Sequence, residues 1–377
     1  MLERPWYVSL NYPLALCAVA LSVFGLIIIK SATLHTPDGA GDYHRQTAYL
    51  IVAIAAMIVF ALIDYHVWQR WAWTIYIVNL LMLGAVAVAG HAALGAQRWV
   101  GVGPLVFQPS EPAKLLLTLS LAAVLADPKR THRRWRDLAA PIAAALVPAL
   151  LVLKQPDLGS ALIFVLILSA MLFFALPNLL HFAAYAAGLT AVAVFTAASP
   201  YILKSYQRRR LLVFLHPKYD PQGAGWSLMQ SKIAIGSGQL TGKGLFSGTQ
   251  TQLGFVPEHA TDFIFTVVGE ELGFLGAVSL LGAYAALLLS AMFVVGAARD
   301  RYGLLVAVGI VSMFLFHVLI NVGMTVGIMP VTGIPLPFIS YGGSSLITCF
   351  MAVGVLLNIH LQRHKISFGE PSPRAAR

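Results

Sequence analysis

The stretch Phe274-Leu-Gly-Ala-Val-Ser-Leu-Leu-Gly-Ala-Tyr-Ala-Ala-Leu-Leu-Leu-Ser-Ala-Met-Phe-Val-Val-Gly296 contains no charged residue. About twenty consecutive apolar residues are enough for an α-helix to cross the hydrocarbon core of a bilayer. Runs of this kind recur, and we expect spans at 13–31, 46–64, 73–90, 111–126, 138–153, 158–175, 178–199, 263–296, 302–328 and 340–361. The sequence therefore predicts an all-α integral membrane protein with about ten transmembrane helices.

The composition supports a membrane protein and argues against a nucleic-acid binder. Of the 377 residues, 58% are hydrophobic and 11% are charged, whereas soluble domains carry roughly 25% charged residues. The net charge of +10 comes from basic residues between the apolar runs, where they orient spans, so we expect no nucleic-acid partner. Cys17 and Cys349 both lie inside apolar runs and indicate no disulfide framework.

Basic residues concentrate at alternate ends of the expected spans. One side carries the dense basic loop 127–136 together with Arg4, Arg70, Arg299, Arg301, Arg363 and Lys365. The short connections on the other side carry only Arg45, Arg98 and Lys154. Because basic loops stay in the cytoplasm, we expect both termini there, including a tail over 363–377. The first run follows Arg4 but shows no clear cleavage site, so it is interpreted as a retained helix.

One connection, 200–261, is unusually long and lies outside the cytoplasm by parity, between the seventh and eighth spans. It is basic, but long loops are translocated largely regardless of charge. Aromatic and aliphatic residues are mixed with many glycines in it, which favours a folded lid or a re-entrant segment over a disordered linker. We treat 1–377 as a single polytopic domain with this extracytoplasmic loop.

Two motifs place ionisable residues beside apolar runs. In Phe107-Gln-Pro-Ser-Glu-Pro-Ala-Lys114, Ser110 is expected to cap a helix, and Glu111 and Lys114 are expected to share one face of it. They form either an interfacial ion pair or part of a site, and the cost of charge near hydrocarbon favours a site. In Lys154-Gln-Pro-Asp-Leu-Gly159, Asp157 either caps the next helix or contributes to that site.

Three arginines are adjacent in Tyr206-Gln-Arg-Arg-Arg-Leu211. They are either a solvated run or a site for phosphate, which arginine binds with two parallel hydrogen bonds. We favour an anionic substrate. The prolines and glycines between Pro330 and Ser345 cannot continue a helix, so the backbone around Ser340 must bend near the outer face. Irregular backbone there should be buried or line a cavity.

The run from Gly248 to Phe265 contains the sharpest signal. Asp262 stands where the polar loop meets a span. Thr261 or Asp262 could be a helix N-cap, but a carboxylate at the mouth of a cavity can also accept a proton from a hydroxyl nucleophile. Glu258 and His259 lie within one turn and could orient a ligand or tune the pKa of that carboxylate.

At these residues the chain resembles the SEDS family (shape, elongation, division and sporulation). The resemblance runs from the first span to Gln362 and rests on the motifs GAQRW, FQPSEPAK, KQPDLG, YQRRRL, QSKIAIGSG and PLPFISYGGSS and on the segment around Asp262. The segments 230–238 and 248–250 look more like the elongation member of the family than the division member. Pro112, Gly254 and Ala260 depart from the family's usual residues, but none of these positions is the aspartate.

The resemblance implies a ten-span peptidoglycan glycosyltransferase of the bacterial cytoplasmic membrane. Its substrate would be lipid II, a disaccharide-pentapeptide on undecaprenyl diphosphate, and its partner a class B penicillin-binding protein. The family's required aspartate maps onto Asp262, which we expect to act as general base. The expected substrate-binding residues are Arg98, Glu111, Lys114, Asp157, Arg208, Arg210, Lys232, Glu258, His259 and Ser340.

The diphosphate of such a substrate needs cationic partners at the outer interface. Lys114 and the three loop arginines could supply them. A divalent cation, Mg²⁺ or Mn²⁺, could also stabilise the leaving group, although the sequence contains no dedicated metal cage. The competing hypothesis is a lipid II flippase, which would need polar groups along a path to the cytoplasmic face, whereas these motifs gather at the outer face.

Overall fold

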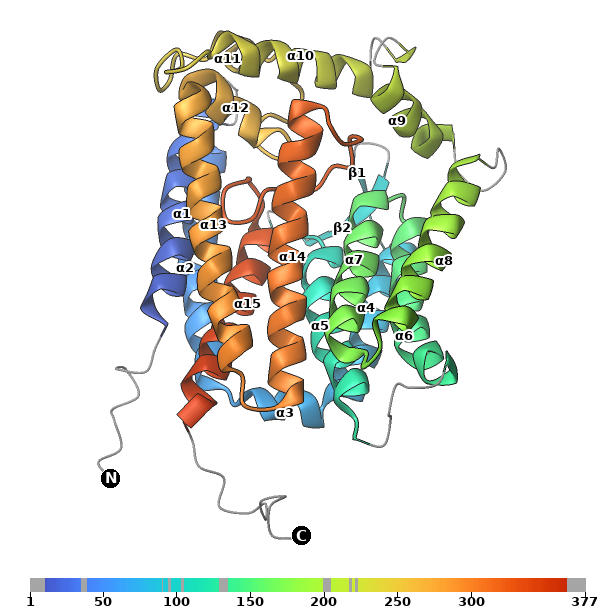
Figure 1. Ribbon diagram of the computed structural model, residues 1–377. Helices are drawn as coiled ribbons and strands as arrows, with labels where there is room; N and C mark the ends of the chain where they lie inside the picture. Colours follow the sequence, from blue (N-terminus) through green and yellow to red (C-terminus); the bar gives the residue numbers. More distant parts are fainter. Residues whose placement is uncertain are drawn as a thin grey trace, which may run out of the picture.

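The computed structural model describes residues 11–34, 39–89, 91–93, 96–102, 105–128, 135–198, 205–216, 219–220 and 223–364. Long helices run side by side along one axis (Figure 1). They are α1 (Tyr12–Ala32), α2 (Gly39–Leu62), α4 (Ala72–Ala89), α5 (Ser110–Ala126), α6 (Trp135–Lys154), α7 (Leu158–Ala175), α8 (Leu179–Ala198), α13 (Gly273–Ala297), α14 (Arg301–Val326) and α15 (Gly343–Leu361).

These helices coincide with the ten predicted apolar runs, so the helical membrane fold is confirmed. Within the described residues, eight of them are long and apolar enough to cross a membrane. The two others are α4, whose stretch Ala72–Val86 is a shorter apolar helix, and α5, which has 17 residues. Because α5 carries Glu111 and Lys114 in its first two turns, it is also the least apolar at one end.

Short helices occupy the two ends of the bundle. One end is covered by α9 (Ser205–Leu215), α10 (Ala224–Ser237) and α11 (Thr249–Gln252), which belong to the long connection that was expected outside the cytoplasm (Figure 1). The opposite end carries α3 (Tyr65–Arg70) and the 3-10 helix Gln362–His364. The basic residues Arg70, Arg299, Arg301 and Arg363 lie in the elements at this second end, so they share one side as their spacing predicts.

The predicted span at 263–296 is wrong at its start. It forms two helices, α12 (Ile264–Glu271) and α13, which are separated at Leu272. Gly273 adopts φ +65°, and a Cβ there would lie 2.3 Å from the backbone nitrogen of Gly242. Only glycine fits this close approach without strain. The residues before Glu270 and after Glu271 are apolar, which led to the expectation of one continuous span, but the backbone turns directly after these two glutamates.

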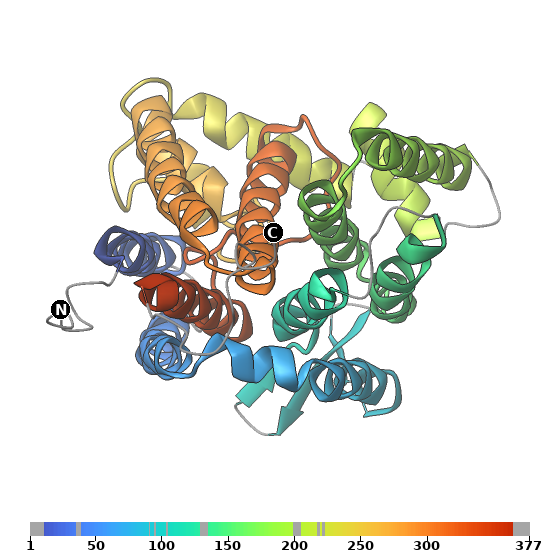
Figure 2. The ribbon, with the colours of Figure 1, turned by 60° about the horizontal axis from the view of Figure 1, so that its bottom comes forward.

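A small antiparallel sheet was not predicted. It consists of β1 (His91–Ala93), β2 (Ala96–Val102) and β3 (Leu105–Phe107) in the order β1-β2-β3. Val100 pairs with Phe107 in the second ladder. The strands lie beside α4 at the edge of the bundle (Figure 2). These strands are short and show no clear alternation of apolar and polar residues. That alternation is the pattern by which a strand is predicted from sequence.

The centre of the bundle is formed by α14 and α15. In their apolar windows 78% and 83% of the residues are buried, whereas none is buried in that of α8. Figure 2 shows α14 between α13 and α7, and α8 at the periphery. Side chains that project from α14 therefore reach the interior of the molecule, and its buried polar residues include His317 and Asn321.

Candidate active site

The backbone around Asp262 is fixed by hydrogen bonds to the carbonyl oxygens of three consecutive residues, 260–262. The carbonyl oxygen of Ala260 accepts a hydrogen bond from the nitrogen of Tyr341 at 2.9 Å. That of Thr261 accepts from the hydroxyl of Ser340 at 2.6 Å, and that of Asp262 accepts from Nδ2 of Asn321 at 2.8 Å. The proline- and glycine-rich segment before α15, together with α14, therefore fixes the path of this loop.

The side chain of Asp262 shares its surroundings with Arg210. A Cβ built on Gly333 would lie 3.1 Å from Oδ2 of Asp262 and 3.8 Å from Nη1 of Arg210. The same arginine nitrogen donates to the carbonyl of Thr332 at 3.1 Å. The structure thus brings a partly exposed carboxylate and a partly exposed guanidinium to one turn of backbone, from segments 52 positions apart in the chain.

The capping alternative for Thr261 and Asp262 is wrong. The N-cap position of α12 is Phe263, and no side chain caps it. The hydroxyl of Thr261 instead donates to Oε2 of Glu258 at 3.0 Å. Asp262 is therefore not placed at the helix start to serve as its N-cap.

The other loop residues expected at the site have different environments. Arg208 and Lys232 are exposed, and the ammonium of Lys232 packs across Gly327, where α14 ends. Glu258 is exposed and has φ +53°, a conformation that costs a non-glycine residue free energy. Both ring nitrogens of His259 lie 2.9 Å from carbonyl oxygens, those of Val256 and Ala32, so this histidine ties the loop to α1.

The hydroxyl of Ser340 both donates and accepts a hydrogen bond. Besides donating to Thr261, it accepts a hydrogen bond from the nitrogen of Leu336 at 2.8 Å. The residue is buried, and in this geometry it shapes the loop that carries Asp262.

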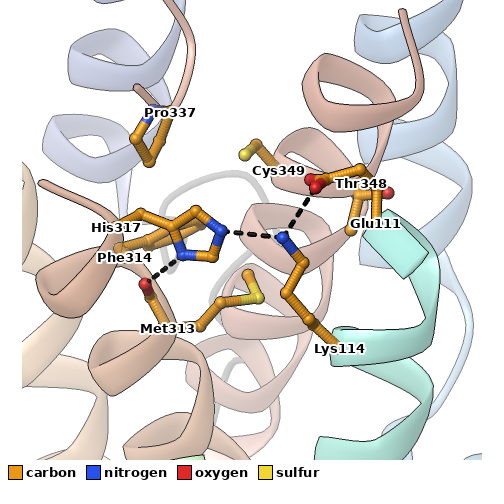
Figure 3. A pocket seen from close by; sticks show the side chains of 8 residues that line it. All are labelled: Glu111, Lys114, Met313, Phe314, His317, Pro337, Thr348 and Cys349. Atoms are coloured by element: carbon orange, nitrogen blue, oxygen red, sulfur yellow. Dashed lines mark hydrogen bonds and ion pairs between the residues drawn. The ribbon is translucent and has the colours of Figure 1, made fainter. Parts of the chain in front are cut away.

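Glu111 and Lys114 share a face of α5 as predicted and form a buried ion pair. Nζ of Lys114 lies 2.7 Å from Oε1 of Glu111, and the side chains are 1% and 4% exposed. Lys114 also lies 2.8 Å from Nε2 of His317 on α14 (Figure 3). Because Nδ1 of His317 lies 2.7 Å from the carbonyl of Met313, Nδ1 carries the proton and Nε2 accepts from the ammonium.

A cavity of about 10 Å³ adjoins this ion pair, and Pro337, Thr348 and Cys349 complete its lining (Figure 3). This volume suits about one water molecule. Pro337 comes from the same loop whose Ser340 holds the backbone before Asp262, so the loop separates the two clusters of functional residues. His317 escaped the sequence reading, although an isolated histidine within an apolar span signals a specific role.

Asp157 caps a helix, which was one of its two expected roles. It is the N-cap residue of α7, and its side chain accepts from the nitrogen of Ser160. The hydroxyl of Ser110 lies 3.4 Å from its other oxygen. Ser110 itself is the first residue of α5 rather than its N-cap, which is Pro109. Arg98 is the last of the expected substrate-binding residues. The structure describes only its backbone, which lies within β2.

Two fully buried carboxylates anchor the outer loop and were also missed. Glu270 accepts from Nζ of Lys243 at 2.8 Å, from the nitrogen of Gln250 at 2.8 Å and from that of Thr251 at 3.1 Å. Burial opposes its ionisation, but these hydrogen bonds hold the pKa of Glu270 below its usual value. The two adjacent glutamates inside an apolar run were the feature of the sequence that could have revealed them, because ionisable residues there usually have a specific role.

The neighbouring carboxylate has the opposite electrostatic balance. Glu271 accepts from the hydroxyl of Ser31 at 2.6 Å and from the nitrogen of Phe246 at 3.2 Å. No cation contacts it among the described residues. Burial raises the pKa of Glu271, and the charge of Glu270 raises it further, against the lowering effect of these hydrogen bonds.

The described side chains form no dedicated cage for a divalent cation. Within the part of the chain that the structure describes, no three His, Cys, Asp or Glu side chains lie close enough together to hold a metal ion. The charged neighbour at the turn beside Asp262 is Arg210, a cation rather than a second carboxylate. We therefore derive no catalytic step through a metal.

Known proteins match this chain over almost its whole length. A family model described as a cell cycle protein, which covers FtsW, RodA and SpoVE, matches residues 12–365. The chain is 37% identical to the peptidoglycan glycosyltransferase MrdB of Escherichia coli, with 96% of each chain covered. It is 38% identical to the probable peptidoglycan glycosyltransferase FtsW of Trichlorobacter lovleyi, with 95% of each covered.

Two solved structures share the fold. A chain from work on the structural coordination of polymerization and crosslinking by a peptidoglycan synthase complex superposes with a TM-score of 0.81 at 32% identity, over 97% of this chain and 100% of that one. The rod shape determining protein RodA of Thermus thermophilus superposes with a TM-score of 0.72 at 30% identity, over 96% and 100%. MrdB and FtsW are thus similar to this chain at comparable identities.

Proposed function

The chain belongs to the FtsW, RodA and SpoVE family and is a multi-pass membrane peptidoglycan glycosyltransferase, and we propose that it polymerises lipid II during cell elongation with Asp262 as general base. The reaction takes place at the outer face of the bacterial cytoplasmic membrane, with both termini in the cytoplasm. The observation that carries the proposal is the approach of the Asp262 carboxylate and the Arg210 guanidinium to the same turn at Gly333.

The proposed step is an inverting displacement. Asp262 takes the proton from the 4-hydroxyl of the acceptor sugar, whose oxygen forms a bond to C1 of the donor sugar. The bond between C1 and the diphosphate oxygen breaks, and the lipid diphosphate leaves with the electron pair. Arg210 stabilises the charge that develops on the diphosphate, because guanidinium donors match phosphate oxygens in pairs.

Other cations guide the substrate rather than react with it. Arg208 and Lys232 are exposed on the same end of the bundle as Asp262, where they can attract the anionic head group. Glu111 and Lys114 are sealed in the core next to His317, so we assign them a part in shaping the floor of the site beneath the Pro337 loop. A class B penicillin-binding protein is the proposed partner, which would cross-link the strands that this enzyme makes.

The test is polymerisation of labelled lipid II by the purified protein, with and without its partner. Asp262→Asn keeps the shape of the side chain but removes the base, so we expect glycan strands to be lost, as they should be with Asp262→Ala. Asp220→Asn is the matched control, because Asp220 belongs to the same outer loop and its carboxylate accepts from the nitrogen of Ala224 at 3.2 Å. Normal polymerisation by Asp262→Asn would exclude the general-base role.

The same assay separates the enzyme from a flippase. Vesicles that carry labelled lipid II only in the outer leaflet supply the polymerase with substrate directly. A flippase would show transfer of lipid II between leaflets and no strands, whereas the proposed enzyme produces strands without any transfer.

A further inference from the structure

Asn321 occupies an unusual position on α14. Its side chain is completely buried, and Nδ2 donates to two carbonyl oxygens, that of Asp262 at 2.8 Å and that of Ile334 at 2.7 Å. Its Oδ1 is buried and has no hydrogen-bond partner among the described residues. Exchanging the two ends of the amide would point an oxygen at two carbonyls, so the orientation is fixed by its contacts.

A buried acceptor without a donor costs free energy, because it has lost its hydrogen bonds to water and gained no partner. A side chain chosen only for stability would avoid this cost, since an apolar residue of similar shape could fill the same space. What distinguishes the amide from such an apolar residue is therefore the pair of hydrogen bonds that it donates.

Those two carbonyls belong to the two segments that form the site. Asp262 carries the carboxylate, and Ile334 directly follows Gly333, the turn that both the carboxylate and Arg210 approach. Arg210 in turn donates to Thr332, one residue before that turn. We propose that Asn321 is a positioning residue that sets the separation between the Asp262 carboxylate and the Arg210 guanidinium, an inference that rests on the proposed function of Asp262.

The hydrogen bonds from Tyr341 and Ser340 to this segment do not involve the backbone of Asp262. Tyr341 and Ser340 hold the carbonyls of Ala260 and Thr261, both of which precede the carboxylate. Among the hydrogen bonds given for the described residues, those of Asn321 on the central helix α14 join the backbone of Asp262 itself to the opposing turn. Removing it lets the two segments drift apart while each keeps its own remaining contacts.

The test compares Asn321→Leu with Asn358→Leu in the purified full-length protein. Asn358 is also buried on a central helix and also bridges segments, because its Nδ2 donates to Ala61 at 2.8 Å and its Oδ1 accepts from Tyr65 at 2.9 Å. It belongs to the last turn of α15, next to the 3-10 helix at one end of the bundle, whereas Asp262 precedes α12, near the end that α10 and α11 cover. It therefore reports the cost of losing a buried asparagine clamp without any effect on the site.

We expect Asn321→Leu to lower kcat for labelled lipid II by roughly 10- to 100-fold, since a misplacement of about 1 Å can cost 100-fold. KM should stay within about twofold, because Arg208 and Lys232 are untouched. Asn358→Leu should show an equal or larger fall in melting temperature with a wild-type kcat per folded molecule. Should Asn321→Leu fold poorly, Asn321→Ser, which cannot reach both carbonyls, is expected to give the same split between kcat and KM.

A wild-type kcat for Asn321→Leu, or a loss that merely follows the folded fraction as in Asn358→Leu, overturns the positioning role. Asp262→Asn in the same assay keeps the two proposals apart. If Asp262→Asn is inactive while Asn321→Leu is fully active, only the inference about Asn321 fails. If Asp262→Asn is fully active, the general-base proposal itself fails.

Discussion

The adjacent residues Glu270 and Glu271 allow a matched test of what holds the outer loop in place. Both are fully buried in α12 and both bond to the loop, but only Glu270 faces a cation, Lys243. The perturbation is Glu270→Gln, with Glu271→Gln as its control. Each variant keeps the length of the side chain, removes one negative charge and turns one acceptor into an amide donor.

The expected magnitude follows from the contacts. In Glu270→Gln the ammonium of Lys243, which is 26% exposed, loses its buried counter-charge, and one of two backbone donors faces an NH₂ group. Breaking a buried ion pair on one side costs about 3–5 kcal/mol, and we take the lower figure because Lys243 can still reach water. Glu271→Gln disturbs only neutral donors, for which about 1 kcal/mol is appropriate.

Trypsin reports this difference at the bond after Lys243. When opening is fast relative to cleavage, the rate of cleavage follows the population of the open loop. A cost of about 3 kcal/mol then means cleavage that is more than about 100-fold faster in Glu270→Gln, against about fivefold in Glu271→Gln. Mass spectrometry of the digest identifies the bond. Equal acceleration in both variants, or a larger one in Glu271→Gln, would refute the role of the Lys243 ion pair.

Two further predictions concern the same region. The lowered pKa of Glu270 means that its contribution is complete above 4.5 and is lost as pH falls through its folded value. The raised pKa of Glu271 has the opposite sign, so its contribution is present below 4.5 and is lost as pH rises. Protection of the loop amides against hydrogen exchange, taken relative to the intrinsic exchange rate at each pH, should therefore be greatest at mildly acidic pH. A protection that changes steadily in one direction would contradict this. Gly273→Ala should lower the melting temperature clearly, because its Cβ would lie 2.3 Å from the backbone nitrogen of Gly242. The control Gly282→Ala meets nothing within 4 Å and should be neutral or stabilising. Equal shifts in melting temperature for the two variants would argue against the close approach at Gly273.

The sequence by itself determined the membrane class, nearly all the spans and the pairing of Glu111 with Lys114. These features depend on local quantities: the length of an apolar run and the spacing of residues on one helix face. It also singled out Asp262, because a carboxylate at the edge of an apolar run stands out without any knowledge of its neighbours. The resemblance to a family rests on the same linear motifs.

The tertiary structure decided which partners these residues meet. Arg210 approaches the turn beside Asp262, His317 approaches Lys114, and Asn321 joins the two segments of the site, yet each partner lies tens of positions or more away in the chain. The break between α12 and α13 was hidden for a related reason, since hydrophobicity records burial and not backbone direction. A one-dimensional pattern carries the propensity of each segment, whereas the site depends on distances between segments, and those distances exist only once the helices have packed.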